Sequence, residues 1–228
     1  MKIGLFGKLP TKRDFVAFNA PRSFLTVWEN WVQAGIAASR SSMGAGWTDV
    51  FLQAPIWRFW LGPELCKVGT MGALMPSVDG VGRYFPLSIF GIASEASFIE
   101  PPVIAPQDDW FGTIEAALLN TLDQNFAMEP AEIVSALTSP RETTLHGAPY
   151  AQQALSSGVV LTPDGQASAS EIFPVLRQHD MRVYYGKRSY WWTIGGEHYS
   201  SHVVVCDGMP LPYFFENLLT GNFGTEST

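Results

Sequence analysis

The segment VGTMGALMPSVDGVGRYFPLSIFGI, residues 68–92, decides which kind of sheet this chain builds. Residues 68–75 and 84–92 are apolar runs of the length that is typical of buried strands. The residues between the two runs include types that favour tight turns: Asp79, Gly80, Gly82 and Arg83. Strands that follow one another without a helix between them are expected to pair in antiparallel fashion. The segment therefore predicts two neighbouring strands of an antiparallel sheet.

Strands and helices are also expected on both sides of this segment. Short apolar runs predict strands over residues 2–6, 56–61, 181–185, 189–194 and 201–206. Helical spacing and capping residues predict helices over 21–38, from Asp108, from near Glu129, over 150–155 and over 210–219. The helix from Asp108 is expected to carry one apolar face, formed by Phe111, Ile114, Leu118, Leu122 and Phe126.

The remaining segments are expected to connect these elements. Residues 39–46, 100–107 and 139–149 are rich in small, polar or proline residues and are expected to be loops. Gly-Lys-Arg at 186–188 is expected to form a hairpin turn between two of the strands. The predicted fold class is α/β (α+β): one sandwich domain over residues 1–221, in which helices cover a largely antiparallel sheet, followed by a flexible tail at 222–228.

Composition restricts the possible functions. The chain has 14 basic and 21 acidic residues, a formal charge of −7, and no long basic cluster, which argues against nucleic-acid binding. It contains neither a signal-peptide pattern nor an apolar stretch of membrane-spanning length, so we expect a cytoplasmic protein without membrane insertion. Cys66 and Cys206 are expected to be free thiols, and no metal-ligand spacing or cofactor motif is present.

The loop GKLPTKRDF, residues 7–15, follows the first expected strand and carries Lys8 and Asp14. A glycine-containing loop before a helix can bind phosphate through backbone N–H groups. This loop lacks the GxxxxGK[ST] order of a phosphate-binding loop, however, and it has a single glycine. The alternative is an extended surface loop in which Asp14 caps backbone N–H groups or pairs with an arginine.

The turn PSVDGVGRYFP, residues 76–86, leaves three interpretations open. In the first it is structural: Asp79, Gly80 and Gly82 form a tight turn with positive φ angles, and Arg83 pairs with Asp79 or Asp14. In the second the turn contacts a partner. In the third Ser77, Asp79 and Arg83 take part in catalysis, which requires a base. The possible bases are distant in sequence: His146, His179, His198 and His202.

Two neighbouring tryptophans, Trp191 and Trp192, lie in one of the late strands. Successive side chains of a strand point to opposite faces, so at most one of the pair faces a given core. An exposed tryptophan would mark an interface. The spacing of His198 and His202 falls outside any expected helix, which makes a metal site there a poor interpretation.

Three segments together resemble the TagF (ImpM) family of type VI secretion-associated proteins. They are GLFGKLPTKRDFV at 4–16, MPSVDGVGRYFPL at 75–87 and SYWWT at 189–193. The middle segment is the most specific, because the order S-x-D-x-x-G-R-Y-x-P-L is similar to the hallmark of the family. Arg13 stands where the family pattern has glycine.

The resemblance implies a function, a partner and a set of site residues. Members of this family act after translation to repress a type VI secretion system, without catalysis, metal or cofactor. The implied partner is the forkhead-associated scaffold protein of that system, and the implied fold is a sandwich similar to longin or roadblock domains. The candidate partner-binding or motif-structural residues are Lys8, Asp14, Ser77, Asp79, Gly82, Arg83, Trp191 and Trp192.

One hypothesis connects the two motifs: Asp14, Asp79 and Arg83 meet in space and present a rigid polar surface to a partner. Two alternatives to the regulator remain open. The first is an enzyme acting on phosphate esters through these residues and a histidine. The second is a small-molecule or nucleotide sensor that uses the loop at Gly7 and Lys8.

Overall fold

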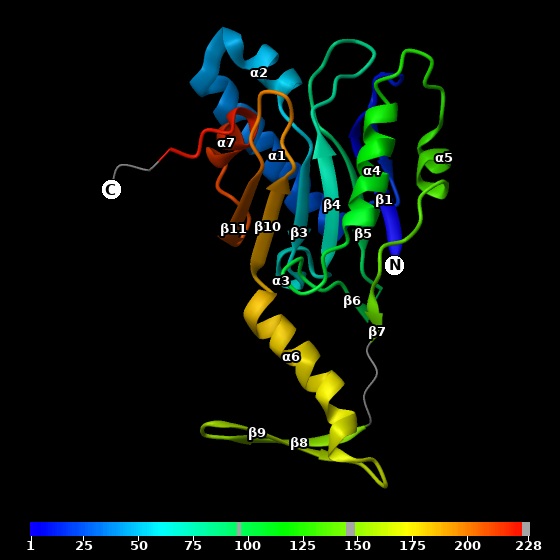
Figure 1. The fold of residues 1–228 in the computed structure, drawn as a ribbon, viewed down its shortest axis with the longest axis vertical. Helices are drawn as coiled ribbons and strands as arrows, with labels where there is room; N and C mark the ends of the chain where they lie inside the picture. Colours follow the sequence, from blue (N-terminus) through cyan, green and yellow to red (C-terminus); the bar gives the residue numbers. More distant parts are fainter. Residues whose placement is uncertain (95–96, 145–148, 225–228) are drawn as a thin grey trace.

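The computed structural model describes residues 1–94, 97–144 and 149–224 and is built around one seven-stranded antiparallel sheet (Figure 1). The order of the strands is β11-β10-β3-β4-β5-β1-β2. Their bounds are β1 (Lys2–Lys8), β2 (Phe15–Phe18), β3 (Trp57–Leu61), β4 (Thr70–Met75), β5 (Leu87–Ile92), β10 (Arg188–Thr193) and β11 (His202–Asp207). The predicted pairing of the two strands within residues 68–92 is confirmed, because β4 and β5 are antiparallel neighbours.

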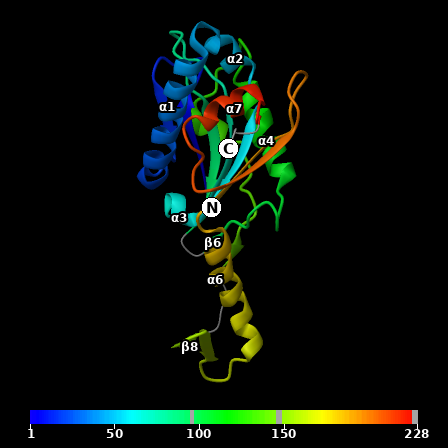
Figure 2. The ribbon, with the colours of Figure 1, turned by 90° about the vertical axis from the view of Figure 1, so that its left-hand side faces the viewer.

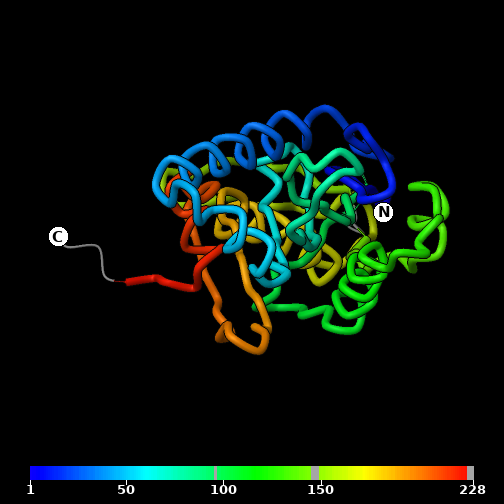
Figure 3. The backbone as a smooth tube through the Cα atoms, turned by 90° about the horizontal axis from the view of Figure 1, so that it is seen from above, coloured from blue at the N-terminus to red at the C-terminus, as the bar shows by residue number. Residues whose placement is uncertain are grey.

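Helices cover both faces of this sheet, which gives the sandwich that the sequence predicts (Figures 2 and 3). The first face is covered by α1 (Arg22–Met43), α2 (Trp47–Gln53) and α7 (Phe214–Thr220), and the second by α4 (Asp108–Asn120) and α5 (Pro130–Ser135). The short elements are η1 (Gly44–Gly46), α3 (Pro63–Cys66), η2 (Ala169–Ile172) and the pair β6 (Ser97–Phe98) and β7 (Thr143–Thr144).

Aromatic side chains fill the core under α1. The Trp191 ring stacks on Trp28 at 5.9 Å between ring centroids and lies 4.6 Å from Trp31, and it is fully buried. Trp192 points to the opposite face, where its ring lies 4.8 Å from Phe111 of α4. The expected alternation is therefore confirmed. Trp191 belongs to the core and cannot contact a partner, while the half-buried Trp192 packs against the second face.

The first helix is longer than the sequence predicts, and the expected loop at 39–46 is wrong. Residues 39–43 continue α1, and the helix ends where Gly44 adopts a positive φ of 57°. Ser39 is buried, and its Oγ accepts a hydrogen bond of 2.8 Å from Trp47 Nε1. Ser39 thus connects α1 to the neighbouring helix α2, a helix that the sequence analysis did not predict.

Three further expectations about secondary structure are wrong. The expected helix at 150–155 is strand β8 (Tyr150–Leu155), which pairs with β9 (Gly158–Pro163). The expected strand at 181–185 is the end of helix α6 (Phe173–Tyr185), so the expected hairpin turn at 186–188 joins a helix to a strand instead. A short apolar run such as 181–185 does not distinguish a strand from a helix end. Strand β2 was not predicted at all.

Helix α6 and the β8–β9 hairpin form an arm, residues 150–185, that projects from one end of the sheet (Figures 1 and 2). No residue of α6 is buried. Within the described ranges, no helix is both long and apolar enough to span a membrane. His146 and residues 225–228 of the expected tail lie outside the described residues.

Candidate functional site

The motif turn, residues 76–86, connects β4 to β5 at the end of the sheet opposite the arm (Figure 1). A bridge between Val78 and Tyr84 closes it, and the backbone N–H of Asp79 donates to the Arg83 carbonyl oxygen at 3.0 Å. Gly82 has a φ of +86°, a conformation that favours glycine. Gly80 does not share the expected positive φ; its N–H instead donates to a carbonyl oxygen of the first loop, that of Lys12, at 2.8 Å.

Asp79 lies at the centre of the motif turn and is only 3% exposed. Its carboxylate accepts hydrogen bonds from Lys8 Nζ, from Arg83 Nε at 2.7 Å, and from the backbone N–H groups of Val81 and Arg83 at 3.1 and 2.9 Å. Burial alone would raise the pKa of this carboxyl, but the bonds from Lys8 and Arg83 outweigh it and hold the pKa well below its usual range. Asp79 is therefore a fixed anion whose hydrogen-bonding capacity is used within the protein.

Lys8, at the end of β1, connects the start of the first loop to the motif turn. Its side chain is buried, and Nζ lies 4.3 Å from the centre of the Phe15 ring as well as against Asp79. The Ser77 hydroxyl donates to the Lys8 carbonyl oxygen at 2.8 Å. Gly7 lies within β1, where a Cβ atom would come 2.1 Å from the Pro86 carbonyl oxygen. The loop expected to be extended and exposed is thus packed tightly at its start.

Arg83 and Asp14 lie on the outer side of this network. The Arg83 side chain is 56% exposed, and its Nη2 donates to the Arg13 carbonyl oxygen. The distance from Nη2 to Asp14 Oδ1 is 3.6 Å, so the two form an ion pair beyond hydrogen-bond reach. The hypothesis that Asp14, Asp79 and Arg83 meet within hydrogen-bond reach is therefore wrong in that form: Asp79 bonds to Arg83, whereas Asp14 lies just beyond reach. The hydrogen bond with Asp79 raises the pKa of the Arg83 guanidinium.

Four exposed residues of the two motifs form a small mixed surface, which we call the motif rim: Asp14, Phe15, Val81 and Arg83. Phe15 is 46% exposed, yet its ring packs edge-on against Phe85 at 4.8 Å. Val81 is 55% exposed at the tip of the turn. The rim combines apolar and charged side chains on a backbone held by the Asp79 network.

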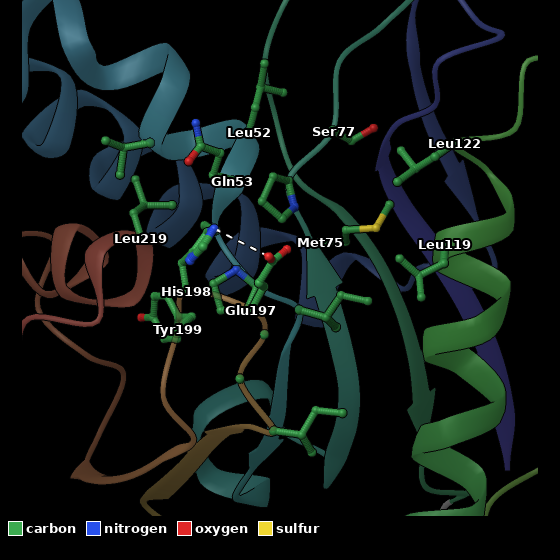
Figure 4. Close-up of a pocket in the computed structure, with 18 of the residues that line it drawn as sticks. Leu52, Gln53, Met75, Ser77, Leu119, Leu122, Glu197, His198, Tyr199 and Leu219 are labelled. Atoms are coloured by element: carbon green, nitrogen blue, oxygen red, sulfur yellow. Dashed lines mark ion pairs between the residues drawn. The ribbon is translucent and has the colours of Figure 1, made fainter.

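A groove of about 750 Å³ opens beside the motif turn (Figure 4). Ser77 and Met75 line it from the sheet side, Leu119 and Leu122 from the α4 side, and Leu219 from α7 (Figure 4). Leu122 was expected on the buried face of a helix, but α4 ends at Asn120 and leaves Leu122 54% exposed. Sequence analysis missed this groove because it is formed where several elements end together.

Glu115, the acidic residue on the α4 side of the groove, is paired with a buried arginine. Glu115 accepts two hydrogen bonds from Arg58, at 2.6 Å from Nε and 2.9 Å from Nη2, and Arg58 also reaches Asp108 at 3.0 Å. His198 lies 4.0 Å from Glu197. Within the described residues, no group of three or more His, Cys, Asp or Glu side chains could hold a metal ion. The groove is therefore a mainly apolar surface.

The chain was also compared with known proteins. It matches the family model described as TagF N-terminal domain, type VI secretion system-associated, over residues 4–137. No curated protein matches significantly. Its structure is similar to the crystal structure of PA0076 from Pseudomonas aeruginosa PAO1, with a TM-score of 0.76 and 29% sequence identity, over 100% of this chain and 98% of that one. Because the family model covers more than half of the residues, including both motifs of the network, the chain belongs to the TagF family of type VI secretion system-associated proteins.

Proposed function

We propose that this protein is a non-enzymatic, post-translational repressor of a type VI secretion system that acts by binding another component of the apparatus. One observation carries the proposal. The most distinctive polar residues of the two motifs are bonded to one another inside the protein, whereas the motif rim around them is exposed. Such an arrangement stabilises a surface and leaves its centre unavailable to a substrate.

The rim has the composition of a protein-binding surface. Aromatic residues and arginine are enriched in protein interfaces, and Phe15 and Arg83 supply one of each. The apolar groove beside the rim adds area, because the two surfaces meet at the motif turn. We further propose that the component bound is the forkhead-associated scaffold protein of the secretion system.

The enzyme and sensor alternatives receive less support from the same geometry. A general acid or base must be free to exchange a proton with the substrate. Asp79 is buried with its pKa held low, and the Ser77 hydroxyl donates to a backbone carbonyl. A phosphate site at Lys8 would require its ammonium to leave a buried carboxylate.

The test is a titration of the purified protein with the cognate forkhead-associated scaffold, phosphorylated and unphosphorylated. Val81→Asp places an unpaired charge on the motif rim and should weaken binding at least about tenfold, as expected for a substitution at an interface centre. Val103→Asp is the matched control, because Val103 is also an exposed valine, at 63%. Its binding should equal that of the natural protein.

A second readout connects binding with repression. Val81→Asp should release secretion in cells in the same way as deletion of the gene, whereas Val103→Asp should not. If the scaffold binds in neither state, the proposed partner is wrong. If secretion is unchanged by the deletion under every inducing condition, the proposed repression is wrong.

A further inference from the structure

A second cavity lies at the opposite end of the sheet from the motif turn, where α6 joins the body of the protein. Its volume is about 320 Å³. One wall is the face of α6 formed by residues at helical spacing: Gln178, Met181, Arg182 and Tyr185. The facing wall is formed by Trp60 of β3 and by residues 67–69, 93–94, 97–99 and 101. The cavity is thus enclosed between the arm and the sheet.

The walls of this cavity combine apolar side chains with several polar and basic ones, and two contacts hold them in place. The Trp60 indole N–H donates to the Ile99 carbonyl oxygen at 3.2 Å, so the ring faces the cavity without an unsatisfied polar atom. An ion pair between Arg177 and Glu100 joins α6 to the segment opposite. A volume of this size is at the lower end of the range for small-molecule sites, which extends from about 300 to 1,000 Å³.

Two basic residues, Lys67 and Arg182, line the cavity. Within the described part of the chain, neither Lys67 nor Arg182 has a side-chain hydrogen bond or an ion pair, in contrast to the neighbouring Arg177. Both side chains belong to exposed residues. None of the described residues that line the cavity is acidic, although the whole chain carries a charge of −7. These described lining residues therefore carry a net positive charge, opposite in sign to that of the whole chain.

We propose that this cavity binds a small soluble amphipathic anion: a compact apolar body that carries a carboxylate, sulfonate or phosphate group. The apolar body packs between Trp60 and Met181, and the anionic group lies near Lys67 and Arg182. A ligand in this position contacts both the arm and the sheet, so it fixes the base of α6. The site is separate from the motif rim, and the proposal does not depend on the proposed function.

The test uses two dyes that differ in charge. The anionic dye 1-anilinonaphthalene-8-sulfonate and the neutral N-phenyl-1-naphthylamine share an aromatic skeleton and differ in the sulfonate. Fluorescence titration of the full-length protein should show saturable binding of the anionic dye. Arg182→Gln and Lys67→Gln should each weaken it about threefold to fivefold, the upper part of the range expected for one solvent-exposed ionic contact, and should leave the neutral dye unaffected. Arg22→Gln, an exposed helical arginine outside the cavity, is the matched control.

Variants that fill the cavity with a larger side chain test whether the dye binds there. A Cβ atom at Gly69 would lie 3.8 Å from the Ile99 backbone nitrogen with no clash, so Gly69→Leu extends a side chain from the cavity wall and should abolish binding of both dyes. Met181→Trp fills the cavity from the side of the arm and serves as a second variant if Gly69→Leu does not fold. Near-UV circular dichroism of each variant shows whether it is folded. Binding that survives both variants, or equal effects of the charge variants on both dyes, overturns the proposal.

Discussion

Replacing Arg58 with leucine should cost more stability than removing any exposed charge of this protein. Arg58 is the second residue of β3 and is 6% exposed, and its guanidinium makes two hydrogen bonds with Glu115 of α4. Without Arg58, the nearly buried Glu115 carboxylate has lost its counter-charge. The pair also connects the sheet to α4, the helix that lines one side of the groove.

The expected loss of unfolding free energy depends on how exposed the partners of Arg58 are. Breaking a buried ion pair from one side costs about 3–5 kcal/mol. The Glu115 side chain is 12% exposed, which allows some hydration and places the expected loss near the lower limit, about 3 kcal/mol. The Asp108 side chain is 75% exposed, so Asp108→Ala should cost less than about 1 kcal/mol.

Urea unfolding followed by tryptophan fluorescence measures these free energies. The double variant Arg58→Leu/Glu115→Leu removes both charges and should recover most of the loss, because replacing a buried pair with apolar residues is often close to neutral. If Arg58→Leu costs no more than Asp108→Ala, or if the double variant loses the sum of the single losses, the pair is not coupled in the way the contacts imply.

Three further predictions concern the motifs and the cysteines. The pKa of Asp79 is lower in the folded protein than in the unfolded chain, so the unfolded chain binds more protons in acid. The melting temperature should therefore fall as the pH drops below about 4. Asp79→Asn should reduce this dependence of the melting temperature on pH. Gly7→Ala should lower the melting temperature markedly, because its φ is +136° and a Cβ would collide with Pro86, whereas Gly112→Ala should not. Burial raises the pKa of the Cys66 thiol to about 12, so iodoacetamide should label the half-buried Cys206 first, as mass spectrometry of the native protein would show.

The sequence predicted the central hairpin well because its signals are local. The length of the apolar runs at 68–75 and 84–92 and the turn residues between them suffice to place β4 and β5. By contrast, nothing local indicates that Lys8 is buried, since lysine is usually exposed and its partner Asp79 is 71 residues away. The motif resemblance indicated that these residues matter but gave no indication of which are exposed.

The late part of the chain was predicted least well for a related reason. Residues 181–185 are apolar enough for a strand, yet they continue a helix that starts at Phe173. The arm has few buried residues, so its sequence lacks the strong periodicity on which such predictions depend. The groove and the second cavity were not predictable, because each is lined by segments that are distant in sequence.

The strand order also bears on how this chain can be shortened. Strand β10 hydrogen-bonds to β3, with Trp191 opposite Phe59, although about 130 residues separate them. A fragment that ends at residue 137, the last residue of the family match, would keep β1 to β5 but lose β10 and β11. It would leave the edge of β3 without its neighbour and remove the tryptophan that packs between α1 and the sheet. The segment that matches the family model therefore lacks two strands of the sheet, and the seven-stranded sheet is complete only after the last third of the chain has been synthesised.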